Sequence, residues 1–176
     1  MEATDKDAIS SLRSVAHPVR LRILSMLTAQ PMSAAEVARE LDLTHANASY
    51  HLRVLHDAGE LVVESEEKIR GGTAKRYRYV VGGDPTRPPG PPSVEDGIAW
   101  QQATHVEIVR RMAHRVKGPS SSSDIETWVT PETWRAAIDL VSQAMVLLHE
   151  QARPARTEGT LHVSASSQAF VMGDPE

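Results

Sequence analysis

The fold of this chain is decided by the stretch THANASYHLRVLHDAG, residues 44–59. Thr44 is one of the residue types that cap helix N-termini, and the stretch ends in a glycine, which lets a helix stop. Between these ends, Ala48, Leu52 and Leu55 recur at steps of three and four residues. This spacing predicts an amphipathic helix whose narrow apolar stripe packs on another element.

The polar faces of this helix carry small and hydrogen-bonding side chains in the first turns and an arginine further along. A helix in the major groove of DNA reads base edges with its first turns and holds phosphates further along. An ordinary amphipathic helix with a polar outer face is the alternative that this segment alone leaves open. The expected DNA contacts are Thr44, His45, Asn47, Ser49, Tyr50 and Arg53.

The segments before this helix predict two more helices. SAAEVARELDL, residues 33–43, has Ser33 as a candidate cap and Glu36 three residues later, the spacing of a capping box. Further upstream, His17 and a following proline begin a helix that runs through Leu27 and ends before Pro31, because the residue before a proline avoids the helical region. Helix, tight turn and helix together make a helix-turn-helix.

The segments after it predict a β-hairpin. Apolar residues at 61–63 and 77–81 flank a pair of glycines, Gly71 and Gly72. Between residues 68 and 78 there are five Lys or Arg side chains and no acidic one, so the hairpin is expected to carry uncompensated cations suited to phosphates or the minor groove. A helix-turn-helix followed by such a hairpin is a winged helix. The expected wing contacts are Lys68, Arg70, Lys75 and Arg76.

Three segments carry a resemblance to a known family: HPVRLRILSML, SAAEVARELDLTHANASYHLRVLHDAGELV and IRGGTAKRYRY. Together they resemble the ArsR-type winged-helix transcriptional regulators, closest to the actinobacterial type with an additional C-terminal region. The resemblance spans residues 9–81 and implies a homodimer, usually a repressor, that binds an inverted-repeat operator in double-stranded DNA. Two alternatives remain: a winged-helix module that binds proteins without reading DNA, and a metal-responsive repressor like the founding members of the family.

The composition argues against metal sensing and against catalysis. The chain has no cysteine, which removes disulfides and thiolate metal sites. Its histidines do not match the helical His and Asp pattern of the zinc sensors in this family: Asp139 and His149, for example, are ten residues apart. We therefore expect no metal and no cofactor. The sequence contains no nucleophile elbow, phosphate-binding loop or HExxH segment, so we expect no enzymatic activity.

The total charge of the chain argues weakly against a nucleic-acid partner, but the total hides how the charges are distributed. The net charge is −4, but residues 1–82 hold eleven basic and eleven acidic side chains, so the acidic surplus lies in the C-terminal part. DNA binding needs a positive face and not a positive total. The N-terminus is polar, and no apolar run approaches the length of a membrane span. We expect a cytoplasmic protein with no membrane contact.

The sequence predicts a mainly α chain with a β-wing, long enough at 176 residues for one sizeable core or two small ones. A winged helix-turn-helix domain at residues 1–82 is followed by a Pro/Gly-rich linker at residues 83–93. Residues 94–176 are expected to form a small helical or α+β region for dimerisation and effector binding. Its predicted elements are a helix at 94–117, a strand at 125–129, a helix at 131–152 and a strand at 161–169.

Two functions are predicted for this C-terminal region. The helix at 94–117 is favoured as the dimer interface, together with Ile9 and Leu12, because dimerisation in the resembled family usually involves helices that flank the winged core. The helix at 131–152 is the other candidate. Three aromatic side chains are a candidate pocket for a small-molecule effector, with plain core packing as the alternative. They are Trp128, Trp134 and Phe170.

Overall fold

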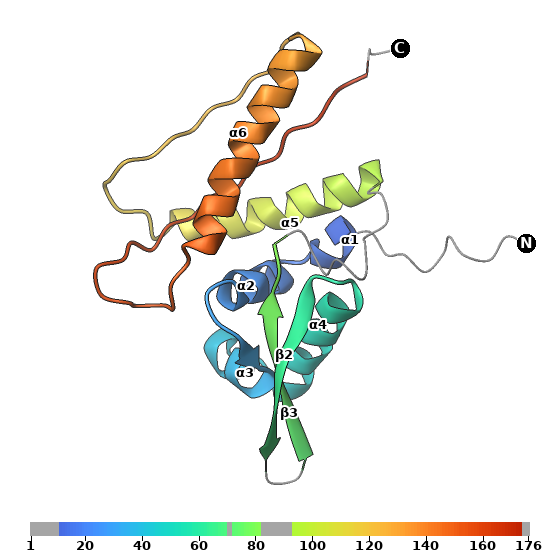
Figure 1. Cartoon of the computed structure of the whole chain (residues 1–176), viewed down its shortest axis with the longest axis vertical. Coiled ribbons are helices and arrows are strands. Elements are labelled where there is room, and N and C mark those ends of the chain that lie inside the picture. The colour runs from blue at the N-terminus through green and yellow to red at the C-terminus, as the bar shows by residue number, and fades with distance from the viewer. Residues whose placement is uncertain (1–10, 70–71, 82–92, 174–176) are drawn as a thin grey trace, which may run out of the picture.

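The computed structural model describes residues 11–69, 72–81 and 93–173. Ile9, Arg70, Gly71 and nearly all of the predicted linker lie outside the described residues. The described elements are α1 (Ser11–Val15), α2 (Pro18–Leu27), β1 (Met32–Ser33), α3 (Ala34–Leu41), α4 (His45–Asp57), β2 (Leu61–Ile69), β3 (Gly72–Tyr79), α5 (Val94–Met112) and α6 (Pro131–Glu150). Three antiparallel strands in the order β1-β3-β2 stand beside the N-terminal helices (Figure 1). The predicted winged helix is confirmed.

Side chains cap the helices where the sequence predicts. The Nδ1 atom of His17 accepts the Val19 backbone N–H at the start of α2 (3.2 Å). Ser33 and Glu36 form the predicted capping box at the start of α3. Thr44 begins α4, and its hydroxyl accepts a backbone N–H of the first turn. Each cap satisfies a donor that the helix cannot, which fixes where the helix begins.

The tight connection between α3 and α4 rests on one backbone conformation. Asp42 is in the left-handed region (φ 53°, ψ 49°) and ends α3. The Leu43 N–H then donates to the Ala38 carbonyl (2.8 Å), as in a Schellman-type helix end. This turn brings α4 across α3 within a few residues.

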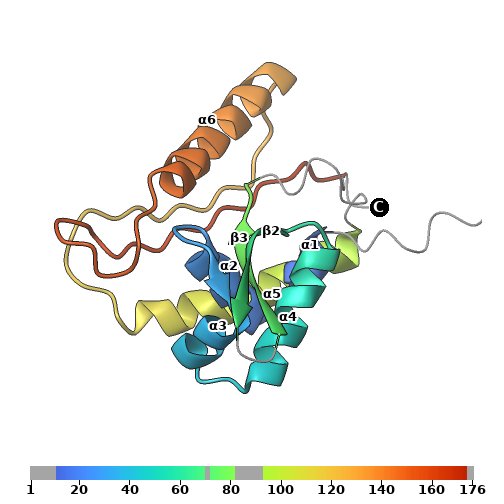
Figure 2. The same ribbon diagram turned by 60° about the horizontal axis from the view of Figure 1, so that its bottom comes forward.

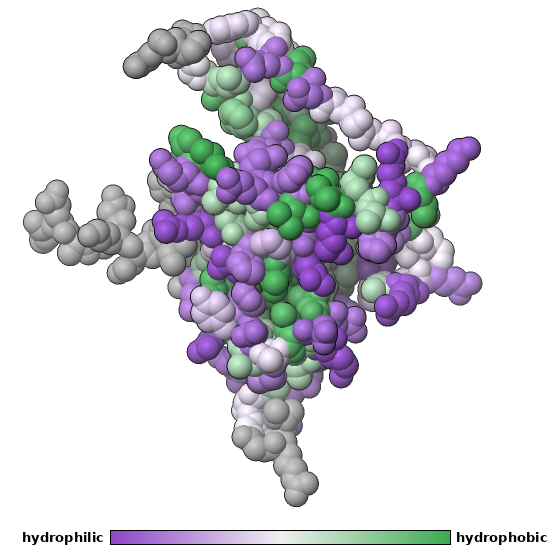
Figure 3. Space-filling view, turned by 180° about the vertical axis from the view of Figure 1, so that it is seen from behind, coloured by the Kyte–Doolittle hydropathy of each residue, from purple (hydrophilic) through white to green (hydrophobic). Residues whose placement is uncertain are grey.

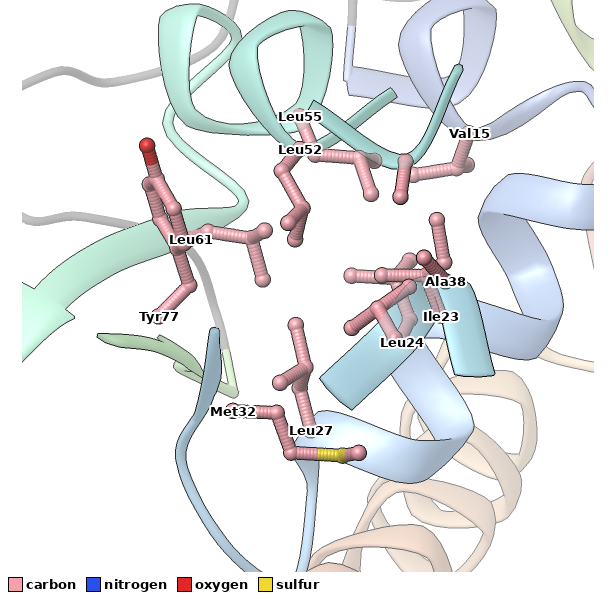
Figure 4. Packing of buried hydrophobic residues seen from close by; sticks show 12 residues of the cluster. Val15, Ile23, Leu24, Leu27, Met32, Ala38, Leu52, Leu55, Leu61 and Tyr77 are labelled. Atoms are coloured by element: carbon pink, nitrogen blue, oxygen red, sulfur yellow. The ribbon is translucent and has the colours of Figure 1, made fainter. Parts of the chain in front are cut away.

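The hydrophobic core lies where α2, α3, α4 and the sheet meet. The predicted stripe of α4 is fully buried: Ala48, Leu52 and Leu55 all have 0% of their surface exposed. Figure 4 shows Leu52 of α4 and Leu27 of α2 pointing into the same core. Burial of large side chains such as these contributes roughly 1.5–3 kcal/mol each, so this core holds α2, α3, α4 and the sheet together.

The hairpin is longer than the sequence predicts, and its sheet has a third strand. β2 and β3 pair from Leu61 opposite Tyr79 to Ile69 opposite Gly72, with a register shift between Val63 and Ser65. β1 has two residues and pairs with β3 next to Tyr77. No periodicity can be seen in so short a strand, which is why the sequence did not reveal it.

The C-terminal region contains both predicted helices. α5 packs on α1 and α2 and ends at Met112 instead of at 117. The residues that follow lead to Gly118 and a proline, which disfavour helix, and Val116 is 82% exposed. α6 begins at Thr130 and Pro131 as predicted. It projects on the side of α5 away from the tip of the β2–β3 hairpin (Figures 1 and 2).

The two predicted C-terminal strands are wrong. Residues 125–129 and 161–169 run as chain without strand structure, so the described part of this region is helical and not α+β (Figure 1). Leu161 and Val163 remain 85% and 61% exposed. Alternation of apolar and polar residues marks one face of a strand, but a strand forms only where a neighbour completes its hydrogen bonds.

Candidate nucleic-acid interface

The outer face of α4 presents the predicted polar side chains. His45, Asn47, Tyr50 and Arg53 are exposed, on the faces away from the buried stripe, whereas Ser49 is half-buried. Thr44 is exposed as well, but its hydroxyl already accepts the Asn47 backbone N–H (3.2 Å). The helix therefore offers amide, imidazole, phenol and guanidinium groups to a ligand that lies along it.

Arg53 is held along the helix by a long contact. Its Nε donates to the Ser49 carbonyl at 3.4 Å, one turn earlier. This contact holds the side chain back over the preceding turn of α4, beside Ser49. A side chain in this place can reach a phosphate beside the helix or a base at the edge of the bound site.

A cluster of basic side chains lies behind α4, where α2 begins. The rings of His17 and His51 are 5.0 Å apart, and the ring of Tyr50 lies 5.4 Å from that of His51. Burial lowers the pKa of His17 and of His51, and the positive charge of Arg20 lowers both further. The Nδ1 of His51 and the Nε of Arg20 are buried and find no hydrogen-bond partner among the described residues. No sequence pattern indicates that Arg20 belongs to this cluster.

Three cations of β3 are compensated, which corrects the prediction of a hairpin with only uncompensated cations. Acidic side chains of β2 lie opposite β3 and pair with its cations. The pairs are Glu66 with Lys75 (3.7 Å), Glu67 with Arg76 (3.8 Å) and Glu64 with Arg78. The prediction counted charges only from residue 68 onward and missed the strand that precedes them. Lys68 is exposed, and it has no ion pair among the residues that the structure describes.

Arg76 joins the wing to the helix-turn-helix. Its Nη2 donates to the Pro31 carbonyl (2.8 Å), and its Nη1 lies 2.9 Å from Oε2 of Glu36. The same Oε2 accepts the Ser33 backbone N–H and hydroxyl at 2.7 and 2.8 Å. Burial tends to raise the pKa of Glu36, but the Ser33 hydrogen bonds and Arg76 outweigh it and hold that pKa below its usual range. The capping box of α3 and strand β3 therefore share one carboxylate.

The three aromatic residues proposed for an effector pocket lie apart from the hollow found in this region. Trp128 and Phe170 are 87% and 66% exposed, and Trp134 is half-buried on α6. A hollow of about 350 Å³ lies instead between the end of α2, the end of β3 and the last turn of α6. It is lined by Thr28, Ala29, Arg78, Tyr79, Val81, His149, Glu150, Ala152 and Arg153. The aromatic pocket stays a prediction.

The described residues include no cluster of three or more His, Asp or Glu side chains placed to hold a metal ion. None of the helices seen in the structure is long and apolar enough to cross a membrane.

Comparison with known proteins identifies the same part of the chain. Residues 15–64 match the helix-turn-helix domain family. An uncharacterised HTH-type transcriptional regulator of Methanocaldococcus jannaschii is 37% identical over 70 residues, which cover 40% of this chain and 72% of that protein. The match to the domain family takes in α2, α3 and α4, and with them the exposed polar face described above.

Proposed function

Because this chain belongs to the HTH-type transcriptional regulators, we propose that it is a dimeric repressor of ArsR type that binds an inverted-repeat operator. One observation carries the proposal. The inner stripe of α4 is completely buried, while His45, Asn47, Tyr50 and Arg53 are exposed on its other faces. A helix fixed in this way on a rigid core can lie in the major groove with its polar face against base edges.

The contacts divide between the helix and the wing. Asn47 and its neighbours on the first turns of α4 read bases, and Arg53 binds a phosphate or a base at the edge of the site. Lys68, near the end of β2, and Arg70 bind phosphates or the minor groove. Lys75 adds a weaker contact because Glu66 partly neutralises it. The contacts of Arg76 favour a structural role over DNA contact.

A two-fold dimer supplies the length of DNA that one winged helix cannot read alone. The inner face of α5, with Ala103 and Glu107, is buried on the N-terminal helices. The outer face leaves Ile98, Val109 and Met112 between 54% and 57% exposed. We expect the two copies to pair through this face, and binding to an inverted repeat requires their α4 helices to lie about one DNA turn apart, roughly 34 Å.

Regulation is assigned to the C-terminal region. A small-molecule effector bound near Trp128, Trp134 and Phe170 would change DNA affinity by favouring one dimer arrangement over another. Trp128 and Phe170 are exposed in the single chain, so other residues would have to cover them to form a closed pocket. A thermal-shift screen of small molecules and divalent metals tests this part of the proposal.

A gel shift with DNA from upstream of the protein's own gene tests the function. We expect a retarded complex of two protomers per site that survives excess random DNA. Arg53→Ala should weaken it, whereas the control Arg135→Ala, on the exposed surface of α6, should leave it unchanged. Equal affinity for operator candidates and random DNA would overturn the proposal.

A further inference from the structure

Helix α6 is too apolar to stand uncovered, yet the structure buries none of its residues. Residues 140–148 contain no charged side chain. Leu140 and Leu147 are 67% and 60% exposed, and Leu148 is 43% exposed. Seen from behind, apolar side chains lie open at several places in the upper part of the molecule, where Figure 1 shows α5 and α6 (Figure 3). A helix with so broad an apolar surface is normally buried.

The open surface of α6 forms a regular seam. At 3.6 residues per turn, Ala137, Leu140, Ala144 and Leu147 fall on one side, at alternating steps of three and four residues. The neighbouring side is half-buried by the rest of the chain. It carries Trp134, Ile138, Met145 and His149. The charged side chains of α6 all lie away from the seam on the same helical projection. They are Glu132, Arg135, Asp139 and Glu150.

We propose that this seam pairs antiparallel with the same seam of a second copy of the chain. The inference rests on the proposed dimer and adds α6 to its interface. In an antiparallel pair with Leu140 opposite Ala144 of the second copy, Ala137 also lies opposite Leu147. Every leucine of the seam then faces an alanine, and two-fold symmetry repeats each contact. Large side chains opposite small ones allow two helices to interdigitate closely.

Because the alternation of leucine and alanine is complementary to itself in the antiparallel direction, we infer that the partner of the seam is a second copy of the chain. A parallel pair would set Leu140 against Leu140 and Ala144 against Ala144, which leaves alternately crowded and empty layers. The number of exposed apolar side chains is also in keeping with an interface between two copies. Nineteen of the twenty-one large apolar side chains exposed in the described residues come after residue 93. A standard protein interface uses about 20–30 residues on each side. In a two-fold contact, the exposed apolar side chains of each copy cover those of the other copy.

The pairing would connect the dimer to the DNA-binding domain. The last turn of α6 touches the wing strand, since the His149 ring lies 5.7 Å from the ring of Tyr79 on β3. Fixing two copies of α6 against each other therefore fixes one end of each wing with respect to the two-fold axis.

Matched charge substitutions in the full chain test the seam. Leu140→Glu should raise the dimer dissociation constant roughly 100-fold or more in sedimentation equilibrium, because symmetry buries the new carboxylate twice. The control Ser142→Glu adds the same charge on the opposite side of α6 and should change that constant less than about 3-fold. Equal effects of the two substitutions would overturn the proposal.

Orientation is tested by disulfide formation, because the chain has no cysteine of its own. Leu140→Cys and Ala144→Cys proteins should each stay uncrosslinked alone and form a disulfide dimer when mixed and oxidised. Crosslinking of either protein with itself would refute the antiparallel register. As a packing check, Leu140→Ala and Ala144→Leu should each weaken the dimer roughly 10-fold or more, and the double variant should recover most of that loss.

These results separate the inference from the proposed function. If the wild-type dimer binds operator DNA and tolerates Leu140→Glu as well as Ser142→Glu, the seam is refuted and the proposed repressor function stands. Conversely, if the seam crosslinks as expected but the chain prefers no DNA sequence, the repressor function is refuted and the seam stands. A wild-type chain that is monomeric at micromolar concentration would overturn the seam, whatever its affinity for DNA.

Discussion

Replacing Arg76 with alanine distinguishes a side chain that holds the wing in place from one that holds DNA. The substitution removes a hydrogen bond to the Pro31 carbonyl (2.8 Å) and an ion pair with Glu36 (2.9 Å). Both charged side chains are only partly accessible, at 24% and 30%. A hydrogen bond involving a charged group contributes about 1.5–3 kcal/mol to stability. With a modest addition from the partly screened ion pair, we expect Arg76→Ala to lower the free energy of unfolding by about 2–3 kcal/mol.

The effect on DNA should differ in kind from that of a lost phosphate contact. Each phosphate contact contributes about 0.9 to the slope of log affinity against log salt. Lys68→Ala should reduce that slope by about this amount, because Lys68 is exposed near the wing tip. Arg76→Ala should weaken binding to all sequences by loosening the wing and leave the slope unchanged.

Urea unfolding and fluorescence anisotropy at several salt concentrations measure the two effects on the same samples. Lys75→Ala is the neighbouring control: its side chain is 51% exposed and is paired only with Glu66 among the described residues. A loss of stability below about 0.5 kcal/mol, together with a salt slope reduced by about one contact, would show that Arg76 binds DNA.

Three further predictions follow from the helix and from the cluster behind it. Asn47→Ala should relax preference at one base position, by about 1–3 kcal/mol of discrimination, and an unchanged profile across operator variants would show that α4 is oriented differently. Thr44→Ala removes the cap of α4 and should cost about 0.5–2 kcal/mol in urea unfolding, whether or not DNA is present. Burial lowers the folded-state pKa of His17 and, for the same reason, of His51, so the unfolded chain binds more protons below about pH 6.5. The contribution of these two neutral rings to the free energy of unfolding should therefore be fully present above that pH and fall as the pH drops toward the lowered folded pKa. His17→Gln should flatten the fall, whereas His105→Gln, on the exposed side of α5, should not.

The starts of the helices could be predicted because their signals are local, whereas the end of α5 at Met112 was not. Ser33 and Glu36 act on each other within one turn, and Thr44 bonds a backbone group three residues later. The identity of the core followed too, since the spacing of Leu52 and Leu55 selects one face of a helix whatever it packs on.

The errors concern contacts between segments distant in the sequence. The wing seemed uncompensated because Glu64, Glu66 and Glu67 precede the basic run and meet it only through strand pairing. The strand predicted at 161–169 failed for the related reason that alternation describes one strand and says nothing of a neighbour. The DNA contact expected of Arg76 stays a prediction, but its hydrogen bond to the Pro31 carbonyl joins residues 45 positions apart and could not be read from the sequence.

The compensated wing changes how this protein must obtain affinity for DNA. If Glu64, Glu66 and Glu67 neutralise most of the cations on β3, one copy of the domain contacts DNA chiefly through α4 and the wing tip. Few phosphate contacts mean weak binding at physiological salt. Linking two such domains makes the second binding event intramolecular and raises the overall affinity with no additional contact. In the proposed dimer, the acidic strand would therefore make selective binding depend on the pairing of two copies, and the exposed apolar surface of α5 and α6 is where we expect that pairing.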